Sequence, residues 1–128
     1  MTVVLDSHGL TMIAANRARL EELRRRGEWP AIVPSVVLAE ALTRDNRRDY
    51  HENRILRTCN IVSVDEMLGR AAGWLRAHVD TRRAPSAVDA VVVAVADRAG
   101  GATVFSSDPR DLRLLARYTD HEVTIAPV

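Results

Sequence analysis

Short apolar runs alternate with longer amphipathic stretches along the whole of this 128-residue chain. The short runs are rich in β-branched residues, which is typical of buried strands, and lie at residues 2–5, 31–33, 60–64, 102–106 and 122–126. Between them, apolar residues at helical spacing predict helices over 10–26, 34–42, 65–75, 86–99 and 108–115, and a helix or helix hairpin over 44–57. Tyr50 and Met67 are among the side chains predicted to face the core. Strands that alternate with helices in this way predict an α/β fold, with a central, mostly parallel sheet flanked by α-helices.

The composition limits the number of domains that the chain can form and indicates the cellular compartment. With 47% hydrophobic residues the chain has material for one core, and we expect a single domain over residues 1–128. The net charge of +1 favours neither nucleic acid nor membrane. One cysteine excludes an internal disulfide and a cysteine-based zinc site. The longest apolar run, 90–96, is far shorter than the roughly 20 residues of a membrane span, and the N-terminus lacks a signal-peptide pattern. We therefore expect a soluble, cytoplasmic protein with no membrane contact.

Two acids lie beside one predicted strand in the segment 85–112. Asp89 falls in the first turn of a helix that Ser86 opens, and Asp108 directly follows the strand 102–106. Helix capping alone explains both, because Ser86 to Asp89 and Asp108 to Asp111 each match a capping pattern. A ligand site is the alternative, since ligands bind at the carboxyl ends of strands in α/β sheets.

Two further acids occupy comparable places earlier in the chain. Asp6 follows the first strand, where a turn residue is the simpler interpretation. Glu40 is the only charge in the apolar run 36–42, so we expect it on a helix with little exposed surface. A buried, unpaired carboxylate is costly, and the alternative is an exposed helix with an arginine partner.

Considered together, the four acids favour a metal site. Carboxylates that gather at one sheet edge repel each other unless a cation neutralises them. Carboxylate oxygens suit Mg²⁺ or Mn²⁺, and such an ion can activate water for phosphodiester hydrolysis.

The order of these motifs resembles that of the PIN-domain ribonucleases, and specifically the VapC-type toxins of bacterial toxin–antitoxin pairs. The resemblance rests on four segments, which are VVLDSH, PSVVLAEAL, SAVDAVVVAVADRAGG and VFSSDPRDL. It implies a PIN domain in which Asp6, Glu40, Asp89 and Asp108 are the catalytic metal ligands, with Asp111 as an auxiliary ligand. One or two Mg²⁺ or Mn²⁺ ions would serve the cleavage of an RNA substrate. It also implies a homodimer that a cognate VapB-type antitoxin inhibits, and small hydroxyl residues, Ser7 and Ser107, that support the site.

Two other functions stay open at this point. A PIN-domain nuclease can process RNA without an antitoxin, and a PIN-like module can bind without catalysis. Arg82 and Arg83, just before the Asp89 helix, are candidate phosphate contacts. The arginines between 44 and 57 are interrupted by acids, and we expect a solvated face with ion pairs there. We expect no aromatic platform for base stacking.

Overall fold

Five parallel strands form a single sheet in the order β3-β2-β1-β4-β5 in the computed structural model, which describes all 128 residues. The strands are β1 (Val3–Leu5), β2 (Ile32–Pro34), β3 (Asn60–Val62), β4 (Ala102–Ser106) and β5 (Val123–Pro127). The helices are α1 (Ser7–Ala14), α2 (Arg17–Arg25), α3 (Val37–Ala41), α4 (Tyr50–Leu56), α5 (Glu66–His78), α6 (Ala87–Arg98) and α7 (Arg110–Ala116). The predicted α/β class is confirmed, and the sheet is parallel throughout.

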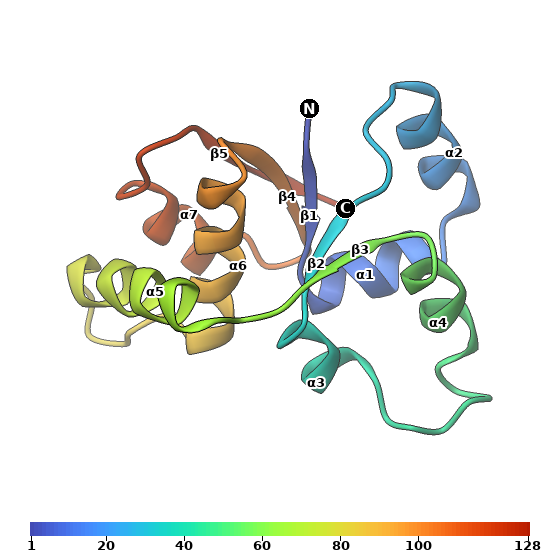
Figure 1. Cartoon of the computed structure of the whole chain (residues 1–128), viewed down its shortest axis with the longest axis horizontal. Helices are drawn as coiled ribbons and strands as arrows, with labels where there is room; N and C mark the ends of the chain where they lie inside the picture. The colour runs from blue at the N-terminus through green and yellow to red at the C-terminus, as the bar shows by residue number, and fades with distance from the viewer.

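Helices cover both faces of the sheet (Figure 1). The helices α1 to α4 lie on one side and α5 to α7 on the other. All three residues of β1 are buried, as is every residue of α6 from Ala90 to Ala96. A helix that is apolar on all sides needs cover on all sides, and α6 packs against α5, α7 and four strands. The core therefore runs through the centre of the sheet and along α6.

The first predicted helix is two helices in the structure. The α1 helix already begins at Ser7, so the interpretation of residues 6–9 as a turn is wrong. Asp6 caps α1, because its side chain accepts a hydrogen bond from the Gly9 N–H. Asn16 in turn caps α2 by accepting from the Arg19 N–H at 3.0 Å. Both α1 and α2 therefore begin at a side-chain acceptor that satisfies a free N–H group of the first turn.

The segment between α3 and α4 also differs from the prediction. The α3 helix ends at Ala41, and Leu42 is extended rather than helical. Tyr50 is 53% exposed and Met67 is 77% exposed, so the prediction that both face the core is wrong. The expected ion pairs are also absent, because no arginine between 44 and 57 lies within ion-pair distance of an acid.

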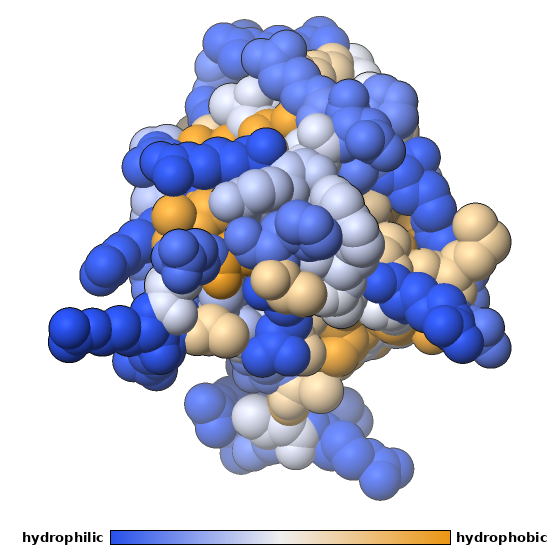
Figure 2. Space-filling model, turned by 90° about the vertical axis from the view of Figure 1, so that its left-hand side faces the viewer, coloured by the Kyte–Doolittle hydropathy of each residue, from blue (hydrophilic) through white to orange (hydrophobic).

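Apolar side chains reach the surface on the side formed by α5 and α7 (Figure 2), where orange patches lie among hydrophilic side chains. Met67 and Trp74 of α5 and Tyr118 after α7 are among the exposed large hydrophobic residues. None of the helices combines the length and the apolar character that crossing a membrane requires.

Candidate acidic site

The predicted acidic residues gather where the central strands end. Asp6 follows β1 directly, and the loop after β4 leads into α7. The first turn of α6, which carries Asp89, lies at the same edge, at the bottom of Figure 1, and α3 lies there as well. Parallel strands with right-handed crossovers place their carboxyl ends together, so residues far apart in sequence become neighbours there.

Asp6 is buried, with 5% of its surface exposed. Its Oδ1 atom accepts the Gly9 N–H at 2.7 Å, which leaves Oδ2 free of protein partners. Gly9 can approach this closely because it has no Cβ. A Cβ at this position would lie 2.2 Å from the carbonyl oxygen of Phe105. The missing Cβ lets the start of α1 pack against β4, and the capping bond fixes the Asp6 carboxylate at the start of that helix.

Asp89 is half-buried in the first turn of α6. The Ser86 Oγ accepts the Asp89 N–H at 3.0 Å, so the prediction that Ser86 caps this helix is confirmed. Burial raises the pKa of Asp89 most strongly, and the hydrogen bond with Ser86 lowers it. The negative charges of Asp111, Asp6 and Glu40 raise it further, and the pKa reaches about 6. The negative charges of three other acids therefore all act on the Asp89 carboxylate.

Asp6, Glu40, Asp89 and Asp111 are from here on called the acidic site. Asp108 is not among the residues whose charge acts on Asp89. Its carboxylate is exposed, and its backbone N–H donates to the Oγ of the buried Ser106 at 3.1 Å. Asp108 does not cap α7 either, since the helix begins after Pro109 without a side-chain cap. Asp111, in the first turn of α7, is the acid of this segment that belongs to the site.

Glu40 is exposed, so the expectation of a helix with little exposed surface is wrong. Only Val37 of the five residues of α3 is buried. The expected alternative, an arginine partner, is also absent, because Glu40 takes part in none of the ion pairs. Its unpaired charge acts on Asp89 instead.

The donor atoms of the acidic site are all carboxylate oxygens, which suit Mg²⁺ or Mn²⁺ and not zinc. No three Asp, Glu, His or Cys side chains stand close enough together to hold one metal ion. The donor chemistry thus fits a hard divalent cation, and the assignment of Asp6, Glu40, Asp89, Asp108 and Asp111 as ligands stays a prediction.

Sequence reasoning missed three features of the structure. The hydroxyl beside Asp108 is that of Ser106 and not Ser107, which is exposed. Asp49 is buried, although it lies in a highly charged segment. Aromatic rings also gather, since the Trp74 and His78 centroids are 3.9 Å apart and those of His78 and Tyr118 are 5.8 Å apart. The spacing of Trp74 and His78 by four residues on a helix signals that contact, and Tyr118 has no local signal.

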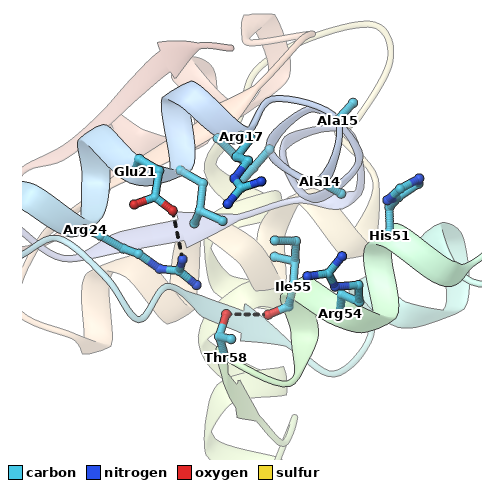
Figure 3. Close-up of a pocket in the computed structure, with 11 residues that line it drawn as sticks. Ala14, Ala15, Arg17, Glu21, Arg24, His51, Arg54, Ile55 and Thr58 are labelled. Carbon is cyan, nitrogen blue, oxygen red and sulfur yellow. Dashed lines mark hydrogen bonds and ion pairs between the residues drawn. The ribbon is translucent and has the colours of Figure 1, made fainter.

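A groove of about 590 Å³ lies between α1, α2 and α4 (Figure 3). It is called the α1/α2/α4 groove below. Apolar residues of the three helices form part of its lining, and Arg17, Arg24, Arg54 and His51 line it as well. Arg24 forms an ion pair with Glu21 at 3.2 Å, whereas Arg17 and Arg54 are in no ion pair. The groove therefore combines apolar surface with positive charge that no residue of this chain neutralises.

Neither a protein-family model nor a curated protein sequence matches the chain. Solved structures match it over nearly its whole length. DNA-bound VapBC from Salmonella typhimurium has a TM-score of 0.70 at 16% identity, over 99% of this chain and 98% of that chain. VapBC2 from Rickettsia felis, bound to a DNA fragment from its promoter, has a TM-score of 0.68 at 16% identity, over 98% and 99%. VapC20 from Mycobacterium tuberculosis, a Sarcin-Ricin loop cleaving toxin, has a TM-score of 0.61 at 21% identity, over 91% and 95%. The chain shares the fold of these toxin–antitoxin proteins, as the resemblance to VapC-type proteins led us to expect.

Proposed function

We propose that this chain is a metal-dependent endoribonuclease, the VapC-type toxin of a toxin–antitoxin pair, which cleaves RNA phosphodiester bonds in the cytoplasm. The observation that carries the proposal is the gathering of three carboxylates around Asp89 at the carboxyl ends of the strands. A fold shared with a Sarcin-Ricin loop cleaving toxin supports the same reaction class.

Asp6, Glu40, Asp89 and Asp111 would close around Mg²⁺ or Mn²⁺ as it binds, because in the structure no three of them lie within reach of one ion. Asp108 would be a further acid at the rim. Such an ion, when bound, polarises a phosphoryl oxygen and lowers the pKa of a water molecule. Asp6 would offer Oδ2 to the ion, because Oδ1 is engaged by the Gly9 N–H. Asp89 keeps its charge at pH 7 in a partly desolvated place, where its attraction for a cation is stronger than in water. Arg82 and Arg83, exposed in the loop before α6, would contact phosphates of the RNA.

A VapB-type antitoxin is the proposed protein partner, and two copies of this chain would form the toxin dimer. Structures with the same fold include VapBC complexes, which supports an antitoxin partner. The α1/α2/α4 groove supports it further, because apolar lining residues beside unpaired arginines suit an amphipathic, acidic peptide segment.

The deciding experiment is cleavage of total RNA by the purified chain with Mn²⁺ or Mg²⁺, with EDTA, and with the Asp89→Asn variant. We expect fragments only with the metal and the unaltered chain. Equal cleavage in every reaction would overturn the proposal and indicate a contaminating nuclease. Mn²⁺ binding by the unaltered chain without RNA cleavage would favour a catalytically silent module. Metal-dependent cleavage that no adjacently encoded protein inhibits would favour a nuclease that acts without an antitoxin.

A further inference from the structure

Asp49 is a buried carboxylate that the proposed reaction does not use. Only 3% of its surface is exposed, and no arginine, lysine or histidine lies within ion-pair distance. Its hydrogen-bond partners both belong to one residue. Thr43 donates its N–H to Oδ2 at 2.8 Å and its hydroxyl to Oδ1 at 3.0 Å. Burying a carboxylate is costly, and here only the contacts with Thr43 offset that cost.

These bonds close the loop between α3 and α4. Thr43 follows the extended residue Leu42, and Arg44 then takes a left-handed conformation with φ of 66°. The Thr43 Oγ1 also accepts the Asp45 N–H at 3.2 Å. Asp45 in turn accepts N–H groups from the two residues at 47 and 48. The chain that leaves α3 is thus held in one path by a network anchored on the buried Asp49.

The place of Glu40 depends on the path of its backbone, because no side-chain contact fixes it. Its helix α3 has five residues and no side-chain cap at its N-terminus. The Glu40 side chain makes no hydrogen bond or ion pair to the protein, whereas Asp6 accepts a bond from Gly9. Only the backbone positions Glu40, and that backbone is fixed three residues later at Thr43. Figure 1 shows α3 at the sheet edge with the long loop to α4 leaving from its end.

We propose that Asp49 is a positioning residue, which acts through Thr43 to hold the C-terminal end of α3 so that Glu40 faces the acidic site. This inference rests on the proposed function, in which Glu40 helps to hold the metal ion. Asp49 itself does not touch the metal or the RNA. Its removal deletes none of the four carboxylates, but it frees the end of α3, so that Glu40 is no longer held towards the other three.

Mn²⁺ binding without RNA tests this role, for example by electron paramagnetic resonance of free Mn²⁺. Asp49→Ala should weaken Mn²⁺ binding about tenfold, the lower end for a residue that supports metal ligands. Asp49→Asn should restore binding to within about twofold, because its amide oxygen can accept the Thr43 N–H and its NH₂ group can donate to the Thr43 hydroxyl. Thr43→Val removes one of the two bonds and should weaken binding in the same direction, which provides a test if Asp49→Ala does not fold.

A matched control separates positioning from a general loss of stability. Asp65 caps α5, where it accepts from the Leu68 N–H at 2.8 Å and pairs with Arg98 at 3.1 Å. Asp65→Ala thus removes an equally well-bonded aspartate that has no link to α3. We expect this variant to bind Mn²⁺ as the unaltered chain does, even where urea unfolding shows that it is less stable.

The decisive comparison uses Glu40→Gln as a background. If Asp49 acts through Glu40, then Asp49→Ala weakens Mn²⁺ binding in the unaltered chain and adds less than about twofold in Glu40→Gln. The same tenfold loss in both backgrounds would overturn the inference and leave Asp49 a structural residue, as would normal binding by Asp49→Ala. Failure of the unaltered chain to bind Mn²⁺ would overturn the proposed function itself and the inference with it.

Discussion

Asp111 lies close enough to Asp89 for its negative charge to raise the pKa of Asp89, whereas Asp108 does not act on it. The two acids are three residues apart, and the start of α7 separates their roles. Asp108 precedes the helix, and its backbone N–H donates a hydrogen bond to the Ser106 Oγ. Asp111 lies within the first turn of α7. The acid nearest to β4 in sequence is therefore not the one whose charge raises the pKa of Asp89.

This relationship predicts unequal effects for two matched variants. Asp111→Asn should lower the rate of metal-dependent RNA cleavage by about 100-fold or more, since it removes a carboxylate from the site. Asp108→Asn should change the rate less than about threefold, because its carboxylate is exposed and outside the field at Asp89. Single-turnover cleavage of a defined RNA measures both. A larger loss for Asp108→Asn would indicate that Asp108 is a metal ligand.

Asp89→Asn should make the protein more stable while abolishing cleavage. Burial and three neighbouring acids raise the pKa of Asp89 from 3.8 to about 6, so the folded protein disfavours the ionised form. The folded state then binds this proton more tightly than the unfolded chain, and stability falls as the pH rises from about 4 to about 6. After allowance for solvent screening, removing the charge should add roughly 1 to 2 kcal/mol to the free energy of unfolding at pH 7.

Urea unfolding without divalent ions measures that gain. It should be present at pH 7 and should vanish towards pH 4, where Asp89 of the unaltered chain is itself protonated. A less stable Asp89→Asn variant at pH 7 would contradict the electrostatic account of this site.

Mn²⁺ affinity should fall with acid because protons compete for the same carboxylate. Metal ligands must be deprotonated, and Asp89 titrates at about 6. Binding should change little between pH 8 and 7 and weaken by about tenfold between pH 7 and 5 from this group alone. Mn²⁺ titrations followed by water proton relaxation give the affinity at each pH. An affinity that does not change across this range would exclude Asp89 as a ligand.

The order of strands and helices was predictable because each apolar run has the length and periodicity of the element it forms. The buried helix α6 was predictable from its run of alanines and valines, and its Ser86 cap from a local pattern. The places of Asp6 and Asp89 at the sheet edge were predictable, because a residue directly after a strand or in a first helical turn has a defined position there.

The path of the chain between α3 and α4 was not predictable from local signals. The bonds between Asp49 and Thr43 join residues six positions apart within a charged segment, where neither residue looks buried. The α3 helix ends at Ala41, and Glu40 within it is exposed. The α7 helix likewise begins at Arg110 and not at Asp108, so that Asp111 lies in its first turn and Asp108 precedes it.

The α1/α2/α4 groove predicts which charge reversal weakens the antitoxin complex. Arg54 lines the groove, is exposed and is in no ion pair. Arg54→Glu should raise the dissociation constant of the toxin–antitoxin complex at least about tenfold and leave cleavage by the free toxin unchanged. Arg117→Glu, an equally exposed arginine after α7, is the control and should bind as the unaltered chain does. Calorimetry with the proposed cognate antitoxin measures the affinity, and equal losses in both variants would argue against the groove.

Gly9→Ala tests how closely α1 packs against β4, and Gly73→Ala in α5 is its control. In Gly9→Ala the new Cβ would lie 2.2 Å from the Phe105 carbonyl oxygen and 3.2 Å from Asp6 Oδ1, so backbone must move. We expect a loss of roughly 2 to 3 kcal/mol in the free energy of unfolding and weaker Mn²⁺ binding, since Asp6 moves with the helix. Gly73→Ala, within α5, meets no atom within 4 Å and should add roughly 0.5 to 1 kcal/mol by favouring the helix. Urea unfolding of the two variants should give shifts of opposite sign, and a harmless Gly9→Ala would contradict the close packing of α1 against β4.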